Sequence, residues 1–269
     1  MPTIKANGMS MYYEQQGVGD PLVLIPYLAA DNACYAFQVA EYAKHFTCIT
    51  LDLRGTGLSD KPDQPYTTET LADDVAALVA ALGIQKAHIA GLSLGAAISL
   101  WMAAKYPEMV KSVGVHAGWD KSDAYLKSVV EHLQVTAKAM GSVPEMVINA
   151  LLPWCLTPDL YVTKPECLQG LKDFVRSRPA QGLAQFVLQS TAVIGHDVSP
   201  HLNAITAPTL LTVGQFDQLT STRYANRMKA NIRNSELIVW EGCSHASLYE
   251  RVEDFNTRTI AFMREHASA

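Results

Sequence analysis

Residues 87–97 read AHIAGLSLGAA and place Ser93 between Gly91 and Gly95. The six residues before Ser93 form an apolar run typical of a buried strand, and LGAAISLWMAAKYP (94–107) is typical of a helix that stops before a proline. On so tight a strand-to-helix turn, a serine hydroxyl is presented above the sheet, and glycines two positions either side avoid a clash. The pentapeptide alone equally fits a Gly/Ser-rich loop. A nucleophilic serine therefore has to be recognised by its partners elsewhere in the chain.

Strand and helix patterns alternate on both sides of this turn. An Asn7-Gly8 turn joins TIKA and MSMYYEQQ into a predicted hairpin, because Asn-Gly tolerates the positive φ angles that a two-residue turn needs. Further strands are predicted at 22–25, 46–53, 87–92, 110–117, 209–214 and 236–240, and helices at 32–45, 67–84, 94–106, 221–231 and 247–265. The alternation predicts an α/β fold with a mostly parallel eight-stranded sheet flanked by helices.

One region interrupts this alternation. Residues 118–200 contain helical patterns and prolines but no convincing strand. We therefore predict a helical cap over 118–200, inserted after the sixth strand, with residues 1–117 and 201–269 forming the sheet-containing core of a single folding unit. Open α/β sheets bind ligands at the carboxyl edge of their strands, where such a cap would lie.

Composition excludes several classes of protein. The chain has 269 residues, 49% of them hydrophobic, and a net charge of −5 without runs of like charge, which argues against nucleic-acid and membrane partners. The five cysteines are scattered, the N-terminus has no signal-peptide pattern, and no apolar stretch is long enough to span a membrane. No dinucleotide fingerprint and no metal-ligand spacing occur. We expect a cytoplasmic monomer or homodimer without cofactor or metal, acting on a small molecule.

A nucleophilic serine needs a histidine and an acid as partners. For this type of turn, the order along the chain is serine, then acid, then histidine. His245 lies in the polar loop EGCSHAS between the last strand and the last helix, and is the best-placed base. Asp217 follows the strand that ends at Gly214, while Asp120, after the strand near Ala117, is the alternative acid. The other histidines are expected in the core (His88, His116), in or beside the cap (His132, His196, His201) and at the surface (His45, His266).

At these residues the sequence resembles the α/β-hydrolase superfamily. DLRGTGLSDKP (52–62) and YPEMVKSV (106–113) match structural hallmarks of that family. The resemblance implies a serine hydrolase in which Ser93 attacks a carboxylic ester or lactone, His245 relays the proton and Asp217 orients His245. The layout is similar to lactonases, enol-lactone hydrolases, small-ester carboxylesterases and the carbamate or aminoacrylate hydrolases of pyrimidine breakdown. Alternatives with the same residues are a C–C bond hydrolase, a non-hydrolytic receptor and a biosynthetic cyclase or lyase.

The loop after the third strand departs from the family pattern. Where the family has His-Gly, this chain has Pro26 and Tyr27. By position, Leu28 and Leu94 would supply the backbone N–H groups of the oxyanion hole, unless the rebuilt loop shifts this role by one residue to Tyr27. Tyr27, with Trp119 and Trp154 of the cap region, is expected to contact substrate; simple packing of Tyr27 under the cap is the alternative.

Overall fold

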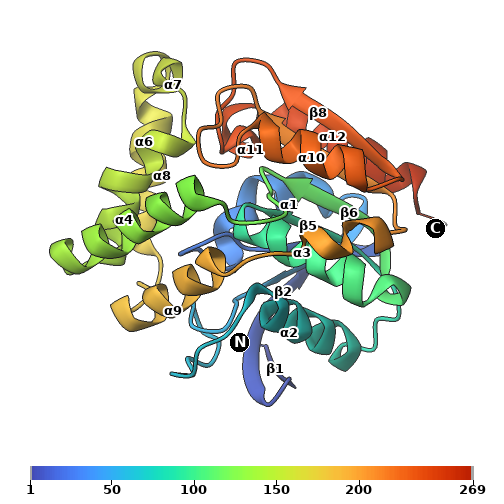
Figure 1. Ribbon diagram of the computed structural model, residues 1–269. Helices are drawn as coiled ribbons and strands as arrows, with labels where there is room; N and C mark the ends of the chain where they lie inside the picture. Colours follow the sequence, from blue (N-terminus) through green and yellow to red (C-terminus); the bar gives the residue numbers. More distant parts are fainter. Residues whose placement is uncertain (1, 268–269) are drawn as a thin grey trace.

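The computed structural model describes residues 2–267, and these fold around one eight-stranded sheet (Figure 1). The strands are β1 (Thr3–Ala6), β2 (Met9–Gln16), β3 (Asp20–Ile25), β4 (Phe46–Leu51), β5 (Ala87–Leu92), β6 (Val110–His116), β7 (Thr209–Gly214) and β8 (Ser235–Trp240). Their order in space is β1-β2-β4-β3-β5-β6-β7-β8. The β1–β2 hairpin is antiparallel, β2 is antiparallel to β4, and every later pair is parallel. The predicted mostly parallel α/β sheet is confirmed.

The helices of the sheet-containing part follow the predicted order. They are α1 (Ala36–Tyr42), α2 (Thr68–Ala81), α3 (Leu94–Lys105), α10 (Thr222–Asn231), α11 (Ser247–Glu250) and α12 (Val252–Glu265). Thr67 caps α2 through a reciprocal pair of bonds with Thr70, which satisfies N–H groups that the first turn leaves without a partner. No helix within residues 2–267 combines the length and apolar character needed to cross a membrane.

Two predicted helices differ from the observed ones. The segment 247–265 is divided at Arg251, whose φ of −135° and ψ of 56° are not helical, so α11 and α12 are separate. The segment 32–45 begins with a 3-10 turn over Asn32–Tyr35 before α1. In both cases the apolar spacing marks the buried face correctly, but spacing alone does not reveal a local change of direction.

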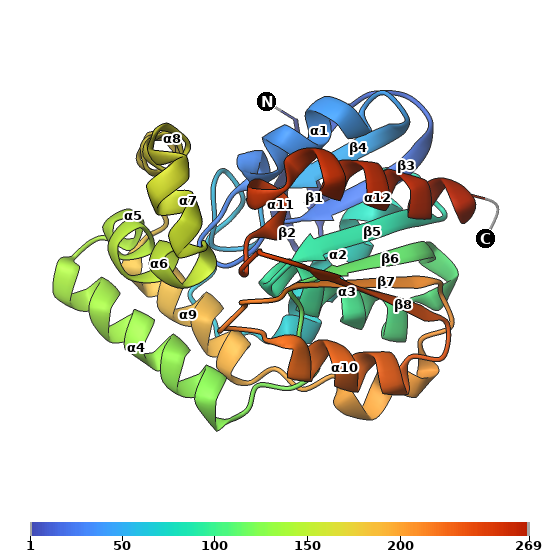
Figure 2. The same ribbon diagram turned by 90° about the horizontal axis from the view of Figure 1, so that it is seen from above.

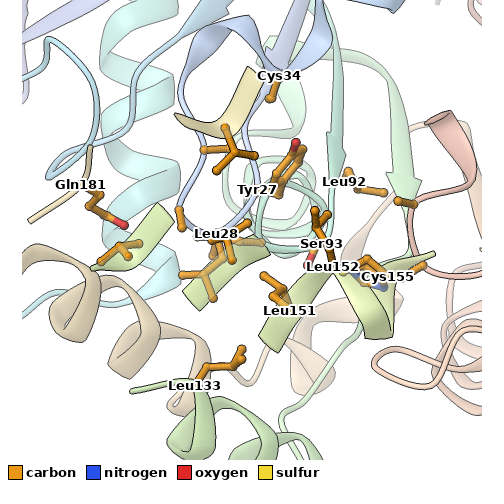
Figure 3. Close-up of a pocket in the computed structure, with 18 of the residues that line it drawn as sticks. Tyr27, Leu28, Cys34, Leu92, Ser93, Leu133, Leu151, Leu152, Cys155 and Gln181 are labelled. Carbon is orange, nitrogen blue, oxygen red and sulfur yellow. The ribbon is translucent and has the colours of Figure 1, made fainter. Parts of the chain in front are cut away.

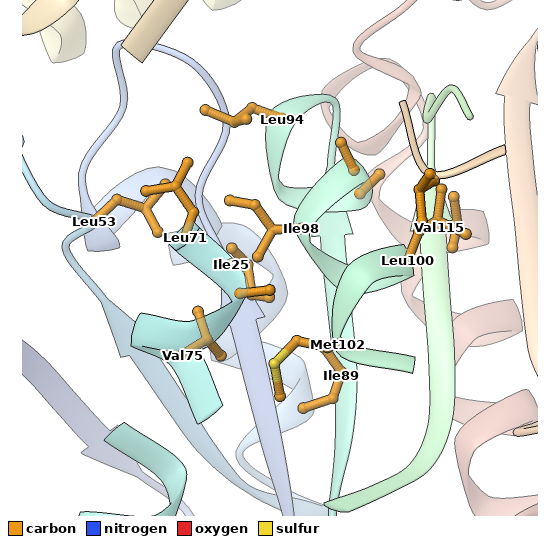
Figure 4. Packing of buried hydrophobic residues seen from close by; sticks show 14 of the residues in the cluster. Ile25, Leu53, Leu71, Val75, Ile89, Leu94, Ile98, Leu100, Met102 and Val115 are labelled. Atoms are coloured by element: carbon orange, nitrogen blue, oxygen red, sulfur yellow. The ribbon is translucent and has the colours of Figure 1, made fainter. Parts of the chain in front are cut away.

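The strand β3 shows why the apolar runs are continuous. Leu22 and Leu24 pack into the cluster on the side of α1 and α12, whereas Val23 and Ile25 pack into the cluster with α2 and α3. Figure 2 shows helices on both faces of the sheet, and Figure 4 shows the second cluster around Ile25. Because successive strand side chains point to opposite faces, a strand covered on both faces needs apolar residues at every position.

Between β6 and β7 the described chain contributes helices but no strand of the sheet. These helices are α4 (Ala124–Met140), α5 (Val143–Met146), α6 (Leu152–Cys155), α7 (Pro158–Thr163), α8 (Pro165–Ser177) and α9 (Leu183–Ile194), with a π-helical turn over Val147–Leu151. They form a separate layer beside the sheet in Figures 1 and 2. The helical insertion predicted after the sixth strand is therefore present, and we call it the cap.

His196 fastens the base of the cap to the sheet-containing part. Its Nε2–H donates to the Trp119 carbonyl at 3.1 Å, so Nδ1 is the acceptor for the Thr68 hydroxyl at 2.8 Å. Its backbone carbonyl accepts the Ser122 N–H at 2.9 Å. Burial lowers the pKa of His196 to about 4, because the charged imidazolium would lose its hydration there.

This arrangement predicts an acid-sensitive fold. The unfolded chain binds a proton at His196 near pH 6.5, and the folded protein binds it only near pH 4. His196 therefore leaves the free energy of unfolding unchanged above pH 6.5 and lowers it progressively as the pH drops toward 4. We expect the His196→Gln variant to lose stability less steeply than the wild type in this window, by up to about 1.4 kcal/mol per pH unit. Urea unfolding at several pH values measures both slopes, and parallel curves would contradict the role given to His196.

Candidate active site

Ser93 occupies a strained turn between β5 and α3. Its φ of 54° and ψ of −118° lie outside the regions that non-glycine residues favour, and its N–H donates to the His116 carbonyl at 2.9 Å. A Cβ on Gly91 would lie 2.2 Å from the carbonyl carbon of Gly95, and a Cβ on Gly95 would lie 2.1 Å from the Ile25 carbonyl oxygen. Both glycines are therefore required by close backbone approach.

A tyrosine that the sequence did not single out fixes the strand ends beside this turn. The Tyr35 hydroxyl donates to the Ile25 carbonyl and accepts the Leu92 N–H, each at 2.8 Å. Tyr35 is 2% exposed, so both bonds are shielded from water. The end of β3 is thereby tied to the residue that precedes Ser93. No local pattern marks Tyr35, because its partners are distant in sequence.

His245 and Asp217 form a buried pair. His245 Nδ1 lies 2.8 Å from Asp217 Oδ2, and Asp217 Oδ1 accepts the N–H groups of Leu219 and Thr220 at 2.8 and 2.9 Å. Burial by itself would raise the pKa of Asp217, but His245 and these hydrogen bonds outweigh it and hold the pKa below its usual value. Asp217 is thus kept ionised, and His245 is oriented with Nε2 as its remaining ring nitrogen.

Thr220 supports the same pair. Its hydroxyl lies 2.9 Å from Asp217 Oδ2, 3.2 Å from His245 Nδ1 and 2.7 Å from the carbonyl of Ala117 at the end of β6. Sequence reasoning did not identify this residue. The stretch from 217 to 220 therefore both holds the acid and joins it to the neighbouring strand.

The alternative acid, Asp120, is engaged elsewhere. Its carboxylate accepts from Arg227 Nε at 2.6 Å and from Arg227 Nη2, and the N–H of Val198 donates to its backbone carbonyl. Asp120 is 1% exposed and does not line the cavity that Ser93 and His245 share. The structure pairs Asp217, and not Asp120, with His245.

Ser93 and His245 open into one cavity between the sheet and the cap (Figure 3). Its volume is about 140 Å³. Within residues 2–267 no hydrogen bond joins Ser93 to His245, and such contacts are often long before a substrate binds. In the same part of the chain no group of three histidine, cysteine, aspartate or glutamate side chains could hold a metal ion. The arrangement can supply a hydroxyl that faces the cavity and an oriented imidazole.

The loop after β3 lies directly opposite Ser93 because of the contact between Gly95 and Ile25. Its backbone N–H groups are used unequally: Ala29 donates to Gln189 Oε1 at 3.1 Å, and Ala30 donates to the Tyr27 carbonyl at 3.2 Å. Among the described residues, the N–H groups of Tyr27 and Leu28 have no acceptor. Leu94 begins α3, so its N–H has no partner within the helix either.

Tyr27 lines the cavity with its ring but not with a free hydroxyl. Its hydroxyl lies 2.8 Å from that of Tyr249, and Tyr249 donates its proton to the Cys34 carbonyl at 2.6 Å. Tyr27 must therefore be the donor to Tyr249. Burial raises the pKa of the Tyr27 hydroxyl well above its usual value. Tyr27 is thus packed against the core and forms part of the cavity wall, and its contact with substrate stays a prediction.

The two tryptophans expected to contact substrate lie in different places. Trp119 lines the cavity, is 2% exposed, and donates from Nε1 to the Ser122 hydroxyl at 2.9 Å. Trp154 is 39% exposed and is not part of the cavity wall. Trp154 lies within the short helix α6, directly after Pro153, and its sequence neighbours do not indicate which way the ring turns.

Comparisons with known proteins identify a family and similar structures for most of the chain. The family described as alpha/beta hydrolase fold matches residues 17–252. The chain is 28% identical over 267 residues to 3-oxoadipate enol-lactonase 2 of Acinetobacter baylyi, across 97% of this chain and 96% of that protein. It is 25% identical over 271 residues to AB hydrolase superfamily protein YisY of Bacillus subtilis, across 94% and 95%. The crystal structure of the enol-lactonase from Burkholderia xenovorans LB400 has a TM-score of 0.88 at 26% identity, across 98% of this chain and all of that one.

The space around two helical glycines predicts opposite effects of replacing them with alanine. Gly95→Ala should cost about 1–3 kcal/mol of unfolding free energy, because its Cβ would collide with the rigid Ile25 carbonyl. Gly170→Ala, in exposed α8 with no neighbouring atom within 4 Å, should stabilise the protein by about 0.5–1 kcal/mol. Urea unfolding of both variants tests this, and equal stabilities would show that the contact at Gly95 is not constraining.

Proposed function

This chain belongs to the alpha/beta hydrolase family of enzymes, and from that premise we propose that it hydrolyses a carboxylic ester or lactone through an acyl-enzyme formed on Ser93. One observation carries the proposal. The buried His245–Asp217 pair, joined at 2.8 Å, faces the same cavity as a serine held on a strained turn. The names of the two enol-lactonase relatives support lactones as one substrate type.

In the proposed reaction, His245 Nε2 removes the proton from the Ser93 hydroxyl as its oxygen attacks the substrate carbonyl carbon. Asp217 holds Nδ1 and stabilises the imidazolium that forms. The tetrahedral intermediate collapses, and His245 gives the proton to the departing alkoxide oxygen. Water, deprotonated by His245, then cleaves the acyl-enzyme. In that step His245 returns the proton to the Ser93 oxygen as the acyl–oxygen bond breaks. With a lactone, the alcohol that leaves the carbonyl remains attached to the acyl chain, so the second step releases a single hydroxy acid.

The oxyanion formed in the attack needs two donors, and we assign them to the backbone N–H groups of Leu94 and Leu28. Pro26 has no N–H, and the N–H groups of Ala29 and Ala30 already have acceptors. The N–H groups of Tyr27 and Leu28 are both free among the described residues, and of the two Leu28 lies at the position that the family uses. Each such donor contributes about 3–4 kcal/mol to stabilising the transition state.

Four variants test the assignment of roles. Ser93→Ala and His245→Ala should each lose at least about a thousandfold in kcat on 4-nitrophenyl acetate, because members of such a group act as a unit. Asp217→Asn should lose activity to a comparable degree. Asp120→Asn is the matched control: it removes a buried aspartate of the same size that pairs with Arg227, so kcat should stay close to wild type in the folded protein.

Labelling with a fluorophosphonate gives a second readout that does not depend on the choice of substrate. We expect one covalent adduct on the wild-type protein and none on Ser93→Ala. An unlabelled wild-type protein that still binds small molecules in the cavity would favour a receptor instead. Equal labelling of wild type and Ser93→Ala would contradict the nucleophile assigned here.

A further inference from the structure

The cavity is chemically divided between a polar floor and an apolar roof. The floor comes from loops of the sheet-containing part and carries Ser93, Thr220 and His245. The roof comes from the cap helices α4, α5, α6 and α8 and the π-helical turn, and each side chain that these elements contribute is apolar or a thiol. We propose that this roof binds an uncharged acyl or alkyl group of about six carbon atoms. The proposal rests on the proposed function and narrows its substrate class.

Helix α4 contributes a regular stripe to the roof. Leu126, Val129, Val130 and Leu133 follow the i, i+3, i+4, i+7 spacing of one helix face, and all four line the cavity. In Figure 3, Leu133 lies on the far side of Leu151 from Ser93. The stripe therefore extends away from the reacting serine and can follow a chain attached to the substrate carbonyl.

The facing elements complete the roof with the same chemistry. They contribute Val143 and Pro144 from α5, Val147 and Leu151 from the π-helical turn, Leu152 and Cys155 from α6, and Leu171, Phe174 and Val175 from α8. Burial raises the pKa of the Cys155 thiol, which keeps it neutral. A polar substrate group under this roof would find no hydrogen-bond partner, at a cost of about 1–3 kcal/mol.

Other polar groups of the wall lie outside these helices and the π-helical turn. The cap loop after α8 contributes Gln181, whose Oε1 has no partner within the described residues and is one acceptor that the cavity offers. Apart from His245, the charged side chains that line the cavity are Asp31 and Arg178, and they pair with each other at 2.7 Å. Their charges are thus compensated within the protein. The volume of about 140 Å³ is close to the ~150 Å³ of an apolar protein cavity that holds one benzene molecule. Both observations favour a small uncharged apolar group.

The test is a series of 4-nitrophenyl esters from acetate to octanoate, with the 4-nitrophenyl monoester of succinic acid as the charged member. We expect kcat/KM to rise by up to about fourfold per methylene as far as hexanoate and then to level off or fall. The succinate monoester should be poorer than butanoate by at least about tenfold. A flat profile, or a succinate ester as good as butanoate, would overturn the apolar roof while leaving the proposed function intact. Absence of hydrolysis of every ester would overturn both.

Two filling variants locate the effect. Leu133→Trp and Leu151→Trp should lower the ratio of hexanoate to acetate activity by at least about tenfold. Val135→Trp is the matched control, since Val135 lies on the same helix but is 66% exposed. Leu151 is only half-buried, so its variant remains informative if Leu133→Trp does not fold. Equal ratios in the filling variants and the control would contradict the proposal.

A separate observation concerns Gln189 of α9. Its Oε1 accepts the Ala29 N–H at 3.1 Å and the Gln181 Nε2–H at 3.3 Å, and Gln181 Nε2 also donates to the Gly55 carbonyl at 3.2 Å. Gln189 is completely buried, and its own Nε2 has no partner within the described residues. The Gln189 side chain therefore acts in this network only as a hydrogen-bond acceptor, through Oε1.

We infer that Gln189 is a positioning residue for the loop assigned to the oxyanion hole. Ala29 has a φ of 61°, a left-handed conformation that costs a non-glycine residue about 1–2 kcal/mol. The bond to Gln189 compensates for this strain and fixes the residue next to Leu28. A cap helix thereby sets where the Leu28 N–H points. This inference also rests on the proposed function.

The variants Gln189→Met and Gln189→Glu separate this role from general packing. Met keeps the size but removes the acceptor, so kcat should fall about 10- to 100-fold with KM within about twofold. Glu keeps an acceptor oxygen and loses only the unpartnered Nε2, so it should retain more activity than Met. Affinity for a trifluoromethyl ketone, whose oxyanion needs the same donors, should fall in parallel with kcat.

Gln185→Met is the matched control, because Gln185 lies one turn earlier on α9 and bonds to Lys61 and Asp63 instead of the loop. Its kcat should stay near wild type. If Gln189→Met does not fold, Gln189→Asn tests the same bond with a side chain too short to reach Ala29. Unchanged kcat and ketone affinity in a folded Gln189 variant, or equal losses in Gln185→Met, would contradict the inference.

Discussion

The site depends on the close approach of the first turn of α3 to the end of β3. The Ile25 carbonyl lies so near Gly95 that no Cβ fits between them. This contact brings the loop after β3 opposite Ser93, and the Tyr35 hydroxyl holds the two strand ends at that spacing. A Cβ at position 95 would push the start of α3, and with it Ser93 and Leu94, away from this loop.

The cap contributes to the site in two ways that its helical composition does not reveal. Its inner face is apolar and encloses the side of the cavity away from the reacting groups. One of its helices also reaches down with a buried glutamine to the loop after β3. Enclosure and positioning are thus supplied by the same segment. A change in the cap can therefore alter both the shape of the cavity and the position of the loop after β3.

Much of the architecture was predictable because it rests on local periodicity. Continuous apolar runs marked strands buried on two faces, and the spacing of α2 with Thr67 before it marked a capped helix. The break at Arg251 was missed because both halves of 247–265 keep the same buried face. Trp154 was expected at the substrate and lies outside the cavity wall, since aromatic composition does not say which way a ring turns.

The sequence by itself determined the order of strands and helices and the turn at Ser93. It also singled out His245 as the base and Asp217 and Asp120 as candidate acids, because these features follow from spacing along the chain. Only the tertiary structure decided between Asp217 and Asp120, since that choice depends on which carboxylate meets His245 and which meets Arg227. It alone revealed Tyr35, Thr220 and Gln189. Each of these residues has at least one hydrogen-bond partner far away in the sequence: Leu92 for Tyr35, Ala117 for Thr220 and Ala29 for Gln189. Such bonds leave no periodic signal.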